Sequence, residues 1–167
     1  PMLGISGGTQ AIISYNYGAK NVGRVKKAFW LLLKVSLSYA VLLWAFIMIF
    51  PQGFAGMFTS APELLVFTKT ALRIYTACLF LFGIQMACQM TFTSLGKAGS
   101  SIIVAVMRKF ILLIPLIYIM PAILRENKAV AVYMAEPIAD FLAVTFTAIL
   151  FFFQFRKCLR QIEQKTF

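Results

Sequence analysis

Four apolar stretches, each long enough to cross a lipid bilayer, dominate this sequence. A hydrocarbon core about 30 Å thick is spanned by about 20 residues of α-helix. The stretches lie at residues 28–50, 74–95, 98–124 and 129–155, and the second can begin as early as Leu64. They are apolar on all sides, as lipid-embedded helices are. The sequence therefore predicts an all-α, polytopic membrane helix bundle with four full transmembrane helices.

The first 17 residues predict a fifth, truncated span. This segment is apolar, but at 1.5 Å per residue it is only about 25 Å long, and it is rich in small and polar residues. Gly4 and Gly8 form a GxxxG pair, which allows another helix backbone to approach closely. Because the chain also opens without an initiator Met, we expect it to be a piece of a longer protein.

Charge is scarce, and its distribution predicts the orientation. Only 13% of the residues are charged, against roughly 25% in soluble domains. The basic residues cluster between the apolar stretches, which is typical of a membrane protein and does not indicate a nucleic-acid partner. The connections at 18–27, 96–109 and 156–167 carry eleven Lys and Arg, and those at 51–63 and 125–128 carry two. The positive-inside rule then places the first set, with the C-terminus, in the cytoplasm of a multi-pass cell-membrane protein. We expect a membrane bundle over 1–155 and a basic cytoplasmic tail over 156–167.

Enzyme chemistry is not expected. The chain has no His, and its three cysteines, Cys78, Cys88 and Cys158, have no metal-site or redox-motif spacing. We therefore predict no catalytic residue, no bound metal and no cofactor.

Charges inside the spans are the best functional candidates, because each is costly to place in a bilayer. Glu136 and Asp140 are four residues apart and share a helix face, with Pro137 between them. Arg73 and Lys69 are similarly spaced near the outer end of their span, where they either extend outward to the membrane surface or pair with one of the acids. The acids are then a structural ion pair, a site that binds a proton or cation, or charges at the outer mouth. Asp140, one turn deeper, is expected to matter more than Glu136.

A polar stripe follows the second full span and suggests a substrate cavity. Gln85 and Gln89 need polar partners or water inside a membrane. Met side chains adapt to varied ligands. The substrate-cavity candidates are Phe82, Gln85, Met86, Gln89 and Thr93. Hydrogen bonding between helices is an equally weighted explanation for the stripe.

Several motifs resemble one transporter family. They are GTQ at 8–10, YNYGAKN at 15–21, RVKKA at 24–28, LGKA at 95–98, Arg108 followed by IPL at 114–116, and EPIAD at 136–140. Together they resemble the C-terminal half of a multidrug and toxic compound extrusion (MATE) efflux transporter.

The resemblance implies two six-helix bundles around a cavity that alternates between the membrane faces, driven by proton or sodium entry. This chain would hold the end of the eighth helix and the ninth to twelfth. The partners implied are the lipid bilayer, small amphipathic or cationic drugs, and the N-terminal lobe of the same polypeptide. Some family members have an acidic cation ligand on the tenth helix. Residues 74–95 contain no Asp or Glu, so a sodium site in this half is not expected.

The function predicted from the sequence is therefore part of a secondary active multidrug or organic-cation efflux antiporter. One alternative is a lipid-linked precursor flippase of the same superfamily, for which Lys34, Lys69 and Arg73 would supply a basic cavity. Another is a membrane scaffold that transports nothing.

Overall fold

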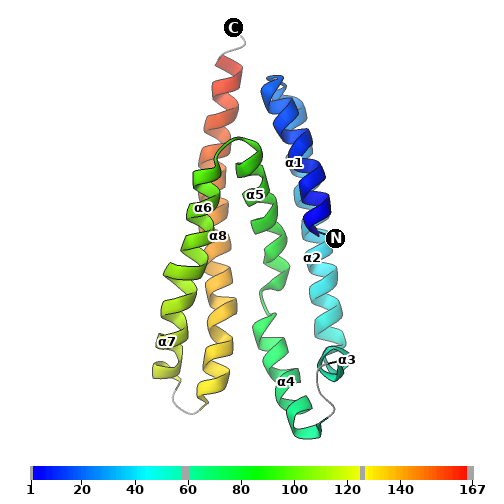
Figure 1. Cartoon of the computed structure of the whole chain (residues 1–167), viewed down its shortest axis with the longest axis vertical. Helices are drawn as coiled ribbons and strands as arrows, with labels where there is room; N and C mark the ends of the chain where they lie inside the picture. The colour runs from blue at the N-terminus through cyan, green and yellow to red at the C-terminus, as the bar shows by residue number, and fades with distance from the viewer. Residues whose placement is uncertain (1, 58–60, 125–126, 165–167) are drawn as a thin grey trace.

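The structure, a computed structural model, describes residues 2–57, 61–124 and 127–164, and over these residues it is an elongated helix bundle without strands (Figure 1). The elements in chain order are α1 (Met2–Gly18), α2 (Val22–Ile49), α3 (Pro51–Gly56), α4 (Pro62–Tyr75), the 3₁₀-helix η1 (Leu79–Leu81), α5 (Phe82–Ser94), α6 (Ala98–Val106), the π-helix η2 (Met107–Leu113), α7 (Ile114–Ile123) and α8 (Lys128–Gln164). The all-α membrane-bundle prediction is confirmed.

Within the described residues, three helices are long and apolar enough to cross a membrane, namely Val22–Ile49, Ala98–Ile123 and Lys128–Gln161. A fourth span is formed if α4 is joined to η1 and α5, which meet at a bend of 41°. The bend falls beside Thr76, whose hydroxyl donates to the Leu72 carbonyl at 2.7 Å. Helices therefore occupy all four predicted stretches, and the second counts as a span when the bent pair is taken as one, in which case it begins at Pro62, before residue 74.

The connections alternate between the two ends of the bundle, as four membrane crossings require. Figure 1 shows the α1–α2 turn, the α5–α6 turn and the C-terminus at one end, and α3 with the α7–α8 connection at the other. The α1–α2 turn contains Lys20 with a φ of 56°, and Asn21 caps α2 by accepting the Arg24 backbone N–H at 3.1 Å. Gly96, with a φ of 70°, closes the α5–α6 turn, a conformation that glycine adopts without strain.

The bundle is packed differently in its two halves. Near the α1–α2 turn, aromatic side chains of α2, α5 and α8 form the core. The Phe29 and Phe151 ring centroids are 4.6 Å apart, and those of Phe92 and Phe151 are 5.3 Å apart. Toward the other end, Ala131 and Ala135 of α8 are fully buried and pack with Met120 of α7. Small residues there let the two helices lie close together.

Several prolines lie within helical stretches or at the start of one. α8 runs unbroken through Pro137 and continues into the basic tail, which is helical as far as Gln164. Pro115 and Pro121 lie in a stretch that is helical throughout, and Pro115 follows the π-helix η2. The connection after residue 50 contains the short helix α3, with Pro51 at its first position, where no backbone N–H is needed.

Gly83 lies at a close contact between the backbones of α5 and α2. A Cβ atom at this position would lie 2.6 Å from the Ser36 carbonyl oxygen and 2.7 Å from the Leu37 Cα atom. Both are backbone atoms of α2, so they cannot rotate away as a side chain can. A glycine at the start of α5 is therefore what allows α2 and α5 to touch beside the bend.

We expect Gly83→Ala to destabilise the protein by roughly 1–3 kcal/mol, the usual range for an overpacked site. The measurement is the thermal unfolding of the full-length protein in detergent. Gly99→Ala is the matched control, because a Cβ there meets nothing within 4 Å. A Gly83→Ala protein as stable as this control would show that α2 and α5 can separate without cost.

Candidate functional site

One arginine and two carboxylates form an ion-pair cluster between the α6–η2–α7 span and α8. The Arg108 Nε donates to Asp140 Oδ1 at 2.6 Å, and the Arg108 Nη2 donates to Glu136 Oε1 at 3.2 Å. Glu136 and Asp140 lie one turn apart on α8, as the sequence spacing predicted, so a single guanidinium reaches both. We call Arg108, Glu136 and Asp140 the charge triad.

The triad lies near the middle of the bundle and is mostly buried. Arg108 is ten residues into its span and Asp140 twelve residues into α8, which corresponds to about 15 and 18 Å of helix. The three side chains are 17%, 12% and 14% exposed in the order Arg108, Glu136, Asp140. Charges at this depth are stable only when they are paired.

Local helix geometry at Arg108 follows from a proline further along the chain. Pro115 has no backbone N–H, and in a regular α-helix its ring would clash with the carbonyl four residues earlier. The chain adopts a π-helix before it, in which the Ile114 N–H bonds to the Lys109 carbonyl. A π-turn accommodates an extra residue and so changes which side chain faces the neighbouring helix. η2 packs on α8, and Arg108 is part of that contact.

Neither Arg73 nor Lys69 forms an ion pair with the acids, so of the two alternatives for these cations the structure does not show the pairing. Arg73 is exposed, and its Nη2 donates to the Met48 carbonyl at 3.3 Å, near the C-terminal end of α2, where a cation is favoured. Lys69, on the same helix, has no ion pair with either acid. The sequence reading had assigned Arg108 to a cytoplasmic connection. Its position ten residues into an apolar stretch was the signal that it lies inside the membrane.

Other side chains connect the triad to the bent span. The Arg108 Cζ lies 5.7 Å from the ring centroid of Phe82, the first residue of α5. The Tyr75 hydroxyl interacts with Glu136, and Cys78 lies near Asp140. The triad therefore joins the α6–η2–α7 span and α8 to the bent span, and it lies beside the bend.

The five substrate-cavity candidates fall into two groups on α5. Gln85 is only 4% exposed, so it packs within the bundle. Phe82, Met86 and Gln89 are half-buried, and Thr93 is exposed. The spacing of these four residues places them on one helix face, which the described chain does not fully cover.

The comparisons with known proteins identify the family. The MatE family model matches residues 1–119 of this chain. The chain belongs to the MatE family.

Solved MatE-family structures share the fold. A ligand complex of the MATE multidrug transporter DinF-BH is 34% identical to this chain and covers 91% of it, with a TM-score of 0.83. An inward-facing multidrug resistance MATE transporter of the MOP superfamily is 23% identical, covers 98% and has a TM-score of 0.81. An outward-facing form is 22% identical, covers 98% of this chain and has a TM-score of 0.80. No curated protein sequence matches the chain.

This MatE chain spans about a third of the length of those proteins. It covers 33%, 37% and 36% of their chains, in the order given above. The uncovered face of α5 is therefore a surface that other parts of such a transporter can meet.

The charge of the triad does not balance within this MatE bundle. One guanidinium faces two carboxylates, so the fully ionised triad has a net charge of −1. Removing either acid leaves a neutral pair, whereas removing Arg108 leaves two like charges close together in a low-dielectric environment.

We expect Arg108→Gln to destabilise the full-length protein by roughly 2 kcal/mol or more, somewhat below the 3–5 kcal/mol found for fully buried pairs. Glu136→Gln and Asp140→Asn should each cost clearly less, because a neutral pair remains. The triple variant with all three changes should recover most of the lost stability. Thermal unfolding in detergent measures this order.

The control is Arg73→Gln, which removes an exposed guanidinium and should change the melting temperature little. If the melting temperature of Arg108→Gln equalled that of this control, the triad would not hold the helices together.

Proposed function

We propose that this chain is part of the C-terminal lobe of a secondary active efflux antiporter. It would export small amphipathic or cationic drugs in exchange for protons or sodium ions, with residues 1–155 in the membrane. The observation that carries this proposal is the unbalanced charge triad near mid-membrane in a MatE-family bundle. A second carboxylate that shares one arginine is neutralised when a proton or cation arrives, and this is the event that ion coupling requires.

Phe82 links the proposed substrate surface to the charge triad, because its ring contacts Arg108. We propose that the face formed by Phe82, Met86, Gln89 and Thr93 contacts the substrate, with Gln85 serving helix packing. Phe82 also stacks against Arg108, so a cationic substrate on the Phe82 ring would compete with the guanidinium for the same π-face. Binding of the drug would then favour a different arrangement of the triad.

We propose that alternating access comes from movement of this lobe against the N-terminal lobe, as in transporters built from two repeats. Inward-facing and outward-facing forms share the fold of this chain, with TM-scores of 0.81 and 0.80.

The basic residues invoked for a flippase lie far apart. Arg73 bonds to Met48 of α2, whereas Lys34 lies fourteen residues earlier on α2, about 21 Å away along the helix. Lys34 is exposed beside Lys27 and Trp30. This separation favours drug efflux over a basic cavity for a lipid-linked precursor.

We expect Asp140→Asn and Glu136→Gln to reduce coupled transport by an order of magnitude or more while the protein still folds, with Asp140→Asn the more severe because Asp140 also holds the Arg108 Nε. The assay uses the full-length protein in liposomes and follows a fluorescent organic cation under a pH gradient alone or a sodium gradient alone. The active gradient identifies the coupling ion.

Glu63→Gln is the control for this experiment, since Glu63 is an exposed acid in the first turn of α4. If both triad variants transported like this control, coupling would reside in the rest of the protein.

The orientation has a separate test. We expect a cysteine at Gln161 to be labelled only from the cytoplasm and one at Gly56 only from outside, from the positive-inside rule. Both positions, unlike the buried Cys158, are exposed. Labelling of Gln161→Cys by an impermeant maleimide in intact cells would reverse the topology.

A further inference from the structure

A basic and aromatic cavity lies between α2 and α8, at the end of the bundle that holds the α1–α2 turn. Its volume is about 670 Å³, within the usual size of small-molecule sites. Lys26, Arg156 and Arg160 supply its charge, and Phe29, Trp30 and Phe152 supply aromatic walls. It shares no residue with the charge triad or with the exposed face of α5.

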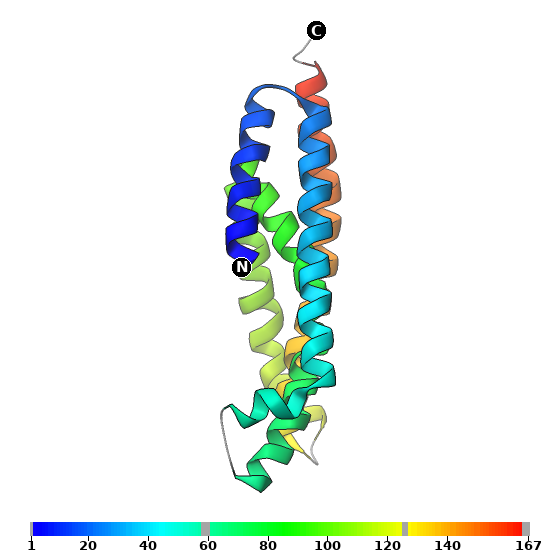
Figure 2. The same ribbon diagram turned by 90° about the vertical axis from the view of Figure 1, so that its right-hand side faces the viewer.

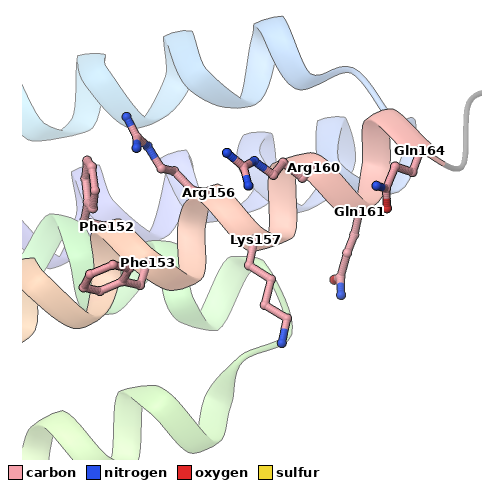
Figure 3. Close-up of a pocket in the computed structure, with 7 residues that line it drawn as sticks. All are labelled: Phe152, Phe153, Arg156, Lys157, Arg160, Gln161 and Gln164. Atoms are coloured by element: carbon pink, nitrogen blue, oxygen red, sulfur yellow. The ribbon is translucent and has the colours of Figure 1, made fainter.

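The two arginines are arranged to act together. They are four residues apart on α8, and Figure 3 shows both on the side of the helix that carries Phe152. The Arg156 Cζ lies 4.1 Å from the Phe152 ring centroid, which fixes the guanidinium over an apolar surface. A second cavity, of about 490 Å³, continues from these arginines to Lys157 and Gln161 (Figure 3).

The cavity has no balancing charge among the side chains that the structure describes. No acidic residue lines it, and no ion pair is formed by Lys26, Arg156 or Arg160 within the described residues. This contrasts with Arg108, which is held by two carboxylates. Three cations gathered without an acid among the described side chains indicate an anionic occupant.

The apolar part of the cavity lining indicates which other chemical group the occupant has. Away from the cations, the lining continues along three helices with Leu33, Ile84 and Ala148, which are apolar and lie deeper in the bundle. A free inorganic anion would leave this part of the cavity unused. An anion attached to a hydrocarbon chain fills both parts.

We propose that this cavity binds an anionic phospholipid of the adjacent leaflet, with its phosphate between Lys26, Arg156 and Arg160 and an acyl chain along Trp30 and Leu33. Basic pockets between transmembrane helices hold lipid headgroups in this way. The proposal goes beyond the transport function and does not depend on which substrate is exported.

Trp30 allows the proposal to be tested directly, because bromine atoms on a lipid chain quench nearby indole fluorescence. The full-length protein is placed in phosphatidylcholine nanodiscs that contain a minor fraction of brominated phosphatidylglycerol or brominated phosphatidylcholine. The Trp30 signal is the fluorescence lost in Trp30→Phe. We expect brominated phosphatidylglycerol to be preferred by at least about five-fold, as one or more specific charge contacts imply.

Matched variants show whether the cavity is responsible. Arg156→Gln with Arg160→Gln should abolish the preference, and Arg156→Lys with Arg160→Lys should keep most of it. The control, Arg24→Gln with Lys97→Gln, removes two exposed cations at the same end that line neither cavity, and should leave the preference intact.

Several results would each overturn the proposal. They are equal quenching by the two brominated lipids, a preference that survives the double glutamine variant, and loss of the preference in the control, which would indicate a general surface charge effect. Displacement of the brominated lipid by inorganic phosphate would likewise make the site one for free anions.

Discussion

The middle of this bundle depends on one guanidinium that two carboxylates share. Arg108 lies where water is scarce, and its only stable arrangement is beside acids that are equally costly to bury. The pairing joins the span carrying Arg108 to α8, and the contact with Phe82 extends it to α5. Because the charges do not cancel, we propose that the same interaction that holds the helices together also responds to a proton or cation.

Close packing and the bend of a span meet at the level of the triad. Gly83 brings α5 against the α2 backbone, and the bend between α4 and α5 lies immediately before it. On one side the core is built from Phe29, Phe92 and Phe151, and on the other from alanines of α8. Shape complementarity, rather than hydrophobicity alone, selects these contacts, since lipid chains are as apolar as the side chains they replace.

α8 connects the two sites proposed here. It carries Glu136 and Asp140 near its middle and Arg156 and Arg160 toward its end, with Asp140 and Arg156 about 24 Å apart along one uninterrupted helix. The acidic pair is neutralised within the bundle by Arg108, whereas the basic pair faces a cavity and is available to a lipid (Figure 2 shows α8 beside α2 along this end). One helix thus carries residues of both proposed sites, one for the coupling ion and one for a lipid.

The sequence alone determined the class of fold, the positions of the four spans and the family, because hydrophobic length and basic punctuation are properties of the chain rather than of its packing. It also placed Glu136 and Asp140 on one face, since helical spacing is local. It did not identify their partner. Arg73 and Arg108 both lie in apolar stretches, and only the packing of α6, η2 and α7 against α8 brings Arg108 to the acids while Arg73 reaches the end of α2. The sequence did not predict the cavity between α2 and α8 either, because Lys26 and Arg160 are 134 positions apart and become neighbours only in the folded bundle.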